Sequence, residues 1–180
     1  GVRFGKMFKT TDGGESWNQQ VSGSGATFYS LKFSNANTGY ATGDYNTIIK
    51  TTNGGANWIT QQSGISNNTQ KFCSISIRSE NGNSCWISGF NETIIKTSTG
   101  GSSWITKKHS VTSNYLWFAS FVNDNTGWVV GENGTIIKTL DGGDSWELQN
   151  SNLFSTLINV NFVNANIGWS VGHNGKILKT

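Results

Sequence analysis

Three carboxylates on short loops are candidate catalytic residues. Asp44, Glu92 and Glu132 each stand between two short segments rich in apolar residues, at corresponding places along the chain. Two carboxylates at a suitable separation can act as acid and base, or as acid and nucleophile, in glycoside hydrolysis. A glycosidase therefore stays open as an alternative function.

Other reactive or ligand-binding patterns are weaker. His109 and His173 have no partners at metal-ligand or triad spacing, and no Gly-rich phosphate loop leads from a strand into a helix. The net charge is only +3, and Arg3 and Arg78 are the only arginines. Most lysines recur once per repeat instead of gathering on one face, which argues against a nucleic-acid footprint. We expect no metal, no cofactor and no nucleic-acid partner.

The loops that carry these residues belong to a repeat. A tryptophan-ended segment occurs four times, with a period in the low to middle forties, at residues 7–17, 48–58, 94–104 and 136–146. A repeat of ~40–45 residues is typical of one four-stranded propeller blade. With no proline, few charged residues and many Gly, Thr and aromatic residues, the composition favours strands joined by turns.

Each repeat predicts four strands, a to d, at residues 29–33, 40–42, 47–51 and 58–61 in the first complete copy. Strand a alternates, so Tyr29, Leu31 and Phe33 share one face, and Trp117 takes a core position in a later copy. Radial stacking of blades would bury these faces. The predicted fold class is all-β, a β-propeller of four-stranded antiparallel blades with about four blades' worth of strands.

The tryptophan-ended segments are interpreted as folding elements. An Asp side chain can accept hydrogen bonds from its own turn, a Gly pair supplies positive φ, and Trp covers the hairpin as an apolar plug. A calcium or sugar site is disfavoured because two of the four copies lack the carboxylate. The predicted structural residues are Asp12, Trp17, Asn53, Trp58, Trp104, Asp141 and Trp146.

Residues 10–17 and 139–146 fit the pattern Ser/Thr, any residue, Asp, any residue, Gly, any residue, Ser/Thr, Trp. This pattern resembles the Asp-box, or bacterial neuraminidase repeat. With the Asn-Thr-Gly-Trp and Gly-Thr-Ile-Ile-Lys-Thr strands, the whole chain is most similar to the photosystem II stability and assembly factor-like propeller family. Asp-boxes also occur in sialidases, xyloglucanases and sortilin-type receptors. A sialidase would need an arginine triad, which two arginines cannot supply.

In the propellers that this chain resembles, ligands meet the face formed by the b-to-c and d-to-a loops. Loops that vary between repeats are the better binding candidates. Tyr45 and Phe90 are expected to contact a partner, and the full predicted set is Asp44, Tyr45, Phe90, Asn91, Glu92, Glu132, Asn133, His173 and Asn174. The predicted function is a secreted or periplasmic, non-catalytic binding or assembly propeller for a protein partner. The alternative is a carbohydrate-binding or glycosidase propeller.

Two features concern compartment and covalent links. No apolar stretch approaches the ~20 residues of a membrane span, and residues 1–4 do not resemble a signal peptide. Cys73 and Cys85 fall on neighbouring strands of one hairpin but are not directly opposed, so a disulfide and two buried thiols both stay open. We expect an extracellular or periplasmic protein without a membrane span.

The repeat divides the chain into units of about 1–21, 22–63, 64–108, 109–150 and 151–180 within one propeller region. The first unit supplies only strands c and d, and the last supplies a, b and c. We therefore expect a section of a longer propeller, or a protomer that self-associates through open blade edges.

Overall fold

The computed structural model describes residues 5–107 and 109–180, so Arg3 lies outside the described residues. The described chain is all-β apart from two one-turn 3-10 helices, η1 (Glu132–Gly134) and η2 (His173–Gly175). Neither is long and apolar enough to cross a membrane, and no other helix occurs in the described ranges. The predicted fold class is confirmed, and the chain forms part of a propeller.

Three four-stranded antiparallel sheets form complete blades, each in the order a, b, c, d. Blade 1 contains β3 (Phe28–Phe33), β4 (Gly39–Gly43), β5 (Ile48–Thr51) and β6 (Ile59–Thr60). Blade 2 contains β7 (Phe72–Ile77), β8 (Cys85–Gly89), β9 (Ile94–Thr97) and β10 (Ile105–Thr106). Blade 3 contains β11 (Leu116–Phe121), β12 (Gly127–Gly131), β13 (Ile136–Thr139) and β14 (Glu147–Gln149).

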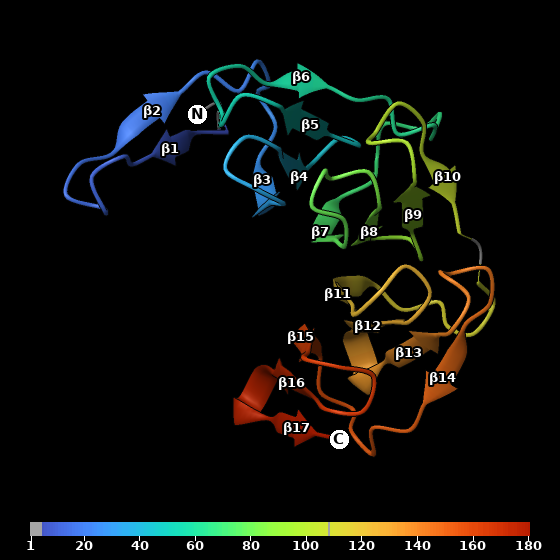
Figure 1. Cartoon of the computed structure of the whole chain (residues 1–180). Helices are drawn as coiled ribbons and strands as arrows, with labels where there is room; N and C mark the ends of the chain where they lie inside the picture. Colours follow the sequence, from blue (N-terminus) through green and yellow to red (C-terminus); the bar gives the residue numbers. More distant parts are fainter. Residues whose placement is uncertain (1–4, 108) are drawn as a thin grey trace.

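The two ends of the chain carry incomplete sheets. Strands β1 (Met7–Lys9) and β2 (Asn18–Gln20) form a hairpin equivalent to strands c and d. Strands β15 (Leu157–Phe162), β16 (Gly168–Gly172) and β17 (Ile177–Lys179) form the last blade, equivalent to a, b and c. The blades fan out in an open arc, with β3, β7, β11 and β15 on its inner side (Figure 1).

The inner strands are linked directly across blades. Serine hydroxyl oxygens on one strand a accept hydrogen bonds from backbone N–H groups of the next strand a. Ser30 accepts from Ile75 at 3.3 Å, Ser74 from Ala119 at 2.9 Å, and Ser120 from Phe162 at 3.2 Å. Small hydroxyl residues thus let neighbouring inner strands approach closely and still satisfy polar groups.

Each strand a begins with a β-bulge. The pairing passes from Phe28 to Ser30, from Phe72 to Ser74, from Leu116 to Phe118 and from Leu157 to Asn159. The skipped residues are Tyr29, Cys73, Trp117 and Ile158. A bulge redirects the side chain of the extra residue, so these four positions do not follow the simple alternation expected from the sequence.

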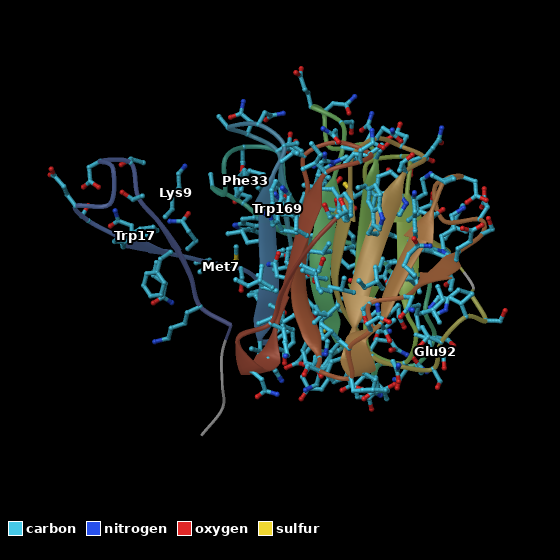
Figure 2. The ribbon with its side chains drawn as sticks, turned by 90° about the horizontal axis from the view of Figure 1, so that it is seen from below. Met7, Lys9, Trp17, Phe33, Glu92 and Trp169 are labelled. Atoms are coloured by element: carbon cyan, nitrogen blue, oxygen red, sulfur yellow. The ribbon has the colours of Figure 1, made fainter. Side chains whose placement is uncertain are left out.

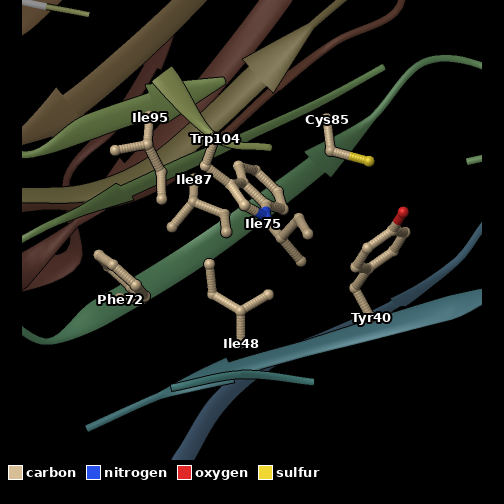
Figure 3. Close-up of a cluster of buried hydrophobic side chains, with 8 residues drawn as sticks. All are labelled: Tyr40, Ile48, Phe72, Ile75, Cys85, Ile87, Ile95 and Trp104. Atoms are coloured by element: carbon tan, nitrogen blue, oxygen red, sulfur yellow. The ribbon is translucent and has the colours of Figure 1, made fainter. Parts of the chain in front are cut away.

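The apolar core lies between blades. Tyr40 of blade 1 and Trp104 of blade 2 meet edge to face, with ring centroids 6.4 Å apart, among isoleucines of both blades (Figure 3). Aromatic residues of strand b also donate hydrogen bonds to the next blade. Tyr40 donates its hydroxyl to the Gly82 carbonyl at 2.8 Å, and Trp86 Nε1–H donates to the Gly142 carbonyl at 3.0 Å.

The box tryptophans differ in burial, which corrects one expectation. Trp104 and Trp146 are only 7% and 6% exposed, and Trp58 is half-buried, but Trp17 is 60% exposed. Trp17 belongs to the β1–β2 hairpin, which pairs with no strand a or b within residues 5–107 and 109–180, so no inner strands cover the indole there. Figure 2 shows this hairpin projecting from the body of the molecule. Leu31 and Phe33 on β3 are exposed for the same reason.

The Asp-box turns are held by the hydrogen bonds that their residue types suggested. Asp12 Oδ1 accepts from the Ser16 N–H at 3.0 Å, and Asp141 Oδ1 accepts from the Ser145 N–H at 2.9 Å. In the other two turns, Asn53 Oδ1 accepts from the Asn57 N–H, and Thr99 Oγ1 accepts from the Ser103 N–H. Hydrogen bonds from Ser16 and Ser145 hold the pKa values of Asp12 and Asp141 well below the usual range.

Both cysteines are free and buried. Cys85 pairs with Ile77 across the β7–β8 ladder, while Cys73 is the bulge residue near the other end of β7. Of the two states left open by the sequence, the structure shows two buried thiols. Burial raises the pKa of each thiol to about 12.

Candidate functional site

The b-to-c loops are tight turns with two successive residues at positive φ. The first place is taken by Tyr45 (φ 58°), Asn91 (52°), Asn133 (52°) and Asn174 (58°). The second is taken by Asn46 (57°), Glu92 (60°), Gly134 (68°) and Gly175 (67°). Asn and Gly suit this left-handed region. Tyr45 and Glu92 do not, so these two side chains occupy a strained backbone, a feature often found at functional sites.

Two of the predicted asparagines also donate hydrogen bonds to neighbouring loops. Asn91 donates to Gln70 Oε1 at 3.2 Å, and Asn133 donates to Asn114 Oδ1 at 3.1 Å. Gln70 and Asn114 belong to the d-to-a loops that lead into β7 and β11. These contacts make Asn91 and Asn133 loop-positioning residues, and they join the b-to-c and d-to-a loops into one surface, here called the loop face.

Aromatic side chains from two blades gather on the loop face. Phe90, in the β8–β9 loop, stacks on Tyr115 with centroids 4.3 Å apart and an interplanar angle of 6°. Phe90 also meets Trp117 edge to face at 5.1 Å. Tyr115 is 37% exposed. The three rings present a partly open apolar platform beside the inner strands.

A charged pair borders this platform. Lys71 Nζ lies 5.4 Å from the Phe90 ring centroid, 6.0 Å from the Tyr29 centroid and 3.9 Å from Asp44 Oδ1. Tyr29 donates its hydroxyl to the same Asp44 oxygen at 2.9 Å. The Lys71 side chain is 45% exposed, so its ammonium group can meet a ligand. We name the set Tyr29, Asp44, Lys71, Phe90, Tyr115 and Trp117 the loop-face cluster.

Backbone hydrogen bonds fix the members of the cluster. The first residue of each b-to-c loop donates its N–H to the carbonyl of the residue before strand a. Phe90 donates to Lys71 at 3.0 Å, Asp44 to Thr27 at 3.0 Å, and Glu132 to Tyr115 at 3.0 Å. This repeated bond places loop residues 44, 90 and 132 directly over the start of the inner strands.

Cys73 lies beside the cluster. Its thiol donates to the Lys71 carbonyl at 3.6 Å, and burial, opposed by the nearby Lys71 charge, raises the thiol pKa to about 12. A thiolate is the nucleophilic form of cysteine. Cys73 therefore fills space beneath Lys71 and is unsuited to nucleophilic catalysis at neutral pH.

The predicted binding residues fall into separate places. Asp44 and Phe90 are joined through Lys71, and Tyr45 and Glu92 are exposed in the same two loops. Glu132 is in blade 3, while His173 and Asn174 are exposed in the last blade. Whether any of them binds a partner stays a prediction. Within the described ranges, no group of three His, Cys, Asp or Glu side chains could hold a metal ion.

Four members of the cluster were not among the predicted binding residues: Tyr29, Lys71, Tyr115 and Trp117. Lys71 and Tyr115 directly precede strand a, where blade 1 and the last blade have Thr27 and Thr156. That departure from the repeat was visible in the sequence. Tyr29 and Trp117 were assigned to the core by alternation, and the bulge at the start of strand a aims them at the loop face instead.

Comparison with known proteins settles the family. The family model described as "Photosynthesis system II assembly factor YCF48" matches residues 12–113 and 105–180. The chain belongs to this YCF48 family. Among curated proteins, none matches the chain.

Solved structures of YCF48 share the fold. "YCF48 from Cyanidioschyzon merolae" has a TM-score of 0.75 at 16% identity, covering 98% of this chain and 63% of that chain. "YCF48 bound to D1 peptide" has a TM-score of 0.61 at 19% identity, covering 86% of this chain and 65% of that chain. The chain thus spans just under two thirds of either YCF48 chain.

Propellers of another class are similar in shape. The GH74 enzyme of Niastella koreensis has a TM-score of 0.69 at 18% identity, covering 92% of this chain and 29% of that chain. Identities this low show the fold alone. The family match, in contrast, extends from Asp12 to the last residue of the chain.

Proposed function

We propose that this chain is a non-catalytic assembly propeller that binds a segment of a partner protein at the loop-face cluster. Its membership in the YCF48 family supports an assembly role, and one YCF48 was solved with a bound D1 peptide. The observation that carries the proposal is the Phe90 platform, where three rings from two blades adjoin a half-exposed lysine.

The chemistry of the cluster defines the segment that it would bind. The partly open rings of Phe90, Tyr115 and Trp117 offer apolar faces for an aliphatic, proline or aromatic side chain. Lys71 can pair with a carboxylate, and it is held over the platform by Asp44. The expected ligand is an extended peptide with an apolar side chain next to an acidic group.

An enzymatic role is less well supported. Asp44 already accepts a hydrogen bond from Tyr29 and pairs with Lys71, while Glu92 and Glu132 belong to two different blades. The family description names an assembly factor, not a hydrolase. We also propose a location outside the cytoplasm, secreted or periplasmic, because only 13% of the residues are charged and the composition is rich in Ser, Thr and Asn.

The proposal is tested by selecting ligands from a displayed random peptide library on the 180-residue chain. Selected peptides should carry an acidic residue near an apolar one. Phe90→Ala should weaken their binding at least about tenfold, because hot-spot aromatics commonly contribute 2 kcal/mol or more. Lys71→Gln should weaken binding and remove its dependence on salt.

Leu140→Ala is the matched control, since Leu140 is an exposed apolar residue in an Asp-box turn, at the opposite end of the blades. Binding that survives Phe90→Ala but is lost with Leu140→Ala would refute the proposed site. A glycan array provides the other arm of the test. Glycan binding that depends on Phe90, with no peptide selected, would favour the carbohydrate-binding alternative over a protein partner.

A further inference from the structure

A groove lies on the rim of the loop face in blade 3. It is lined by residues 111–114 of the β10–β11 loop, residues 133–135 of the turn between β12 and β13, and residues 148–154 of β14 and the loop that follows. Its volume is about 690 Å³, within the ~300–1,000 Å³ typical of ligand pockets. It shares no residue with the loop-face cluster.

The groove opens in front of a side chain that is longer in blade 2. There Gln70, only 6% exposed, accepts hydrogen bonds on its Oε1 from Asn91 at 3.2 Å and Thr93 at 3.1 Å. Asn114 takes this place in blade 3 and donates to Thr135 Oγ1 at 2.8 Å. Asn114 is one methylene shorter and only half-buried. The shorter side chain leaves room in front of it.

A glycine holds the walls of the groove together. Gly134 has a φ of 68°, and a Cβ placed there would lie 2.1 Å from the Leu153 carbonyl oxygen. The β14–β15 loop therefore packs directly on the backbone of this turn, where blades 1 and 2 have the side chains of Asn46 and Glu92. The groove is thus preformed. A ligand can enter it without the cost of ordering the loops.

The walls of the groove supply amide groups. On one wall, Asn133 donates to Asn114 at 3.1 Å and Asn114 donates to Thr135, so these groups are held in place. On the other wall, Asn150 Oδ1 accepts from the Asn152 N–H at 2.9 Å. The Asn150 Nδ2 group and the whole Asn152 amide make no hydrogen bond within the described chain. They can therefore donate to a ligand, and Asn152 can also accept from it.

The groove has no charge and has an aromatic edge. None of its lining residues is charged, and Phe154 at its edge is 92% exposed, more than any other large apolar residue of the described chain. A charged ligand would lose hydration there without gaining an opposite charge. Sugar hydroxyl groups both donate and accept hydrogen bonds, as these amides do. The C–H groups of a sugar ring can pack on the electron-rich face of a phenyl ring.

We propose that this groove binds a neutral oligosaccharide, with one sugar ring stacked on Phe154 and its hydroxyl groups bonded to Asn150 and Asn152. Because no carboxylate lines the groove, the saccharide is bound and not hydrolysed. The site is separate from the loop-face cluster, where Lys71 and Asp44 provide charge for a different ligand.

A glycan array probed with the 180-residue chain, followed by calorimetric titration of the strongest ligand, tests the proposal. Neutral oligosaccharides should bind in preference to anionic ones. Phe154→Ala should weaken binding at least about tenfold, as expected of an aromatic residue that carries binding energy. Phe154→Trp keeps a flat aromatic face and should retain binding. Leu140→Ala is the matched control, because Leu140 is an exposed apolar residue at the opposite end of the blades.

Asn152→Gly separates binding from folding. Asn152 has a φ of 55°, which glycine adopts without strain, so this variant should unfold at about the same temperature. It should bind the glycan about threefold more weakly or worse, the effect of losing one hydrogen-bonding side chain. An array without any bound neutral glycan would overturn the proposal. So would binding that survives Phe154→Ala, or binding that is lost with Phe90→Ala instead, which would place the saccharide on the loop-face cluster.

Discussion

Phe90 and Tyr115 stack with their planes 6° apart although they belong to different blades. Phe90 extends from the β8–β9 loop of blade 2, and Tyr115 directly precedes β11 of blade 3. The stack joins two blades at the loop face and forms part of the surface proposed to bind a partner. The same contact therefore serves both stability and binding.

Phe90→Ala should lower the free energy of unfolding by about 1–2 kcal/mol, because it removes a stacked and an edge-to-face aromatic contact. Tyr45 lies in the equivalent loop of blade 1 and is largely exposed, so Tyr45→Ala should change the free energy of unfolding by less than about 0.5 kcal/mol. Urea titrations measure both. Equal effects of the two substitutions would contradict the described packing.

Trp146→Ala should cost about 3–5 kcal/mol, since Trp146 is buried against Phe121 and the core of blade 3. Trp17→Ala should have a far smaller effect on the monomeric chain, where Trp17 is exposed. The two residues end equivalent Asp-boxes, so each is the control for the other. The comparison needs chain concentrations below any self-association. Similar unfolding midpoints for both variants would contradict the difference in burial between the two indoles.

The sequence was sufficient to predict the strands of the blades. It was not sufficient to predict the burial of Trp17 in the first hairpin or all residues of the loop-face cluster. The period and the Asp-box turns predicted strands that the structure contains, within one or two residues. Trp17 could not be distinguished from Trp146 by its motif, because the burial of the indole depends on inner strands, and β1–β2 pairs with none in the described part of the chain. Trp117 was assigned to the core because alternation ignores the bulge that turns it toward Phe90.

Acid should destabilise the Asp-box turns. Hydrogen bonds from Ser145 hold the folded-state pKa of Asp141 below its usual range. A lowered pKa stabilises the folded state above the unfolded pKa of about 3.9, and this contribution is lost as pH falls toward the folded pKa. Urea titrations between pH 7 and pH 3 should therefore show a steeper loss for the native chain than for Asp141→Asn. Parallel curves would refute this role of Asp141.

Glu92→Gly should raise the free energy of unfolding by about 1 kcal/mol. Glu92 has a φ of 60°, a left-handed conformation that glycine adopts without strain, and Gly134 and Gly175 stand at the same place in later loops. Glu132→Gln is a control in the neighbouring loop that leaves the backbone preference unchanged. Thermal unfolding of the two variants measures the difference, and a destabilised Glu92→Gly would indicate that the side chain makes a stabilising contact.

Hydrogen–deuterium exchange of the 180-residue chain, with and without a selected peptide, tests the proposed binding surface most directly. The account predicts that the peptide slows exchange at residues 71–73, 89–92 and 115–117, which carry the loop-face cluster in blades 2 and 3. Exchange in the Asp-box turns at residues 97–103 and 139–145, at the opposite end of the same blades, should not change. Protection confined to those turns, with none at Phe90 or Tyr115, would contradict the central claim.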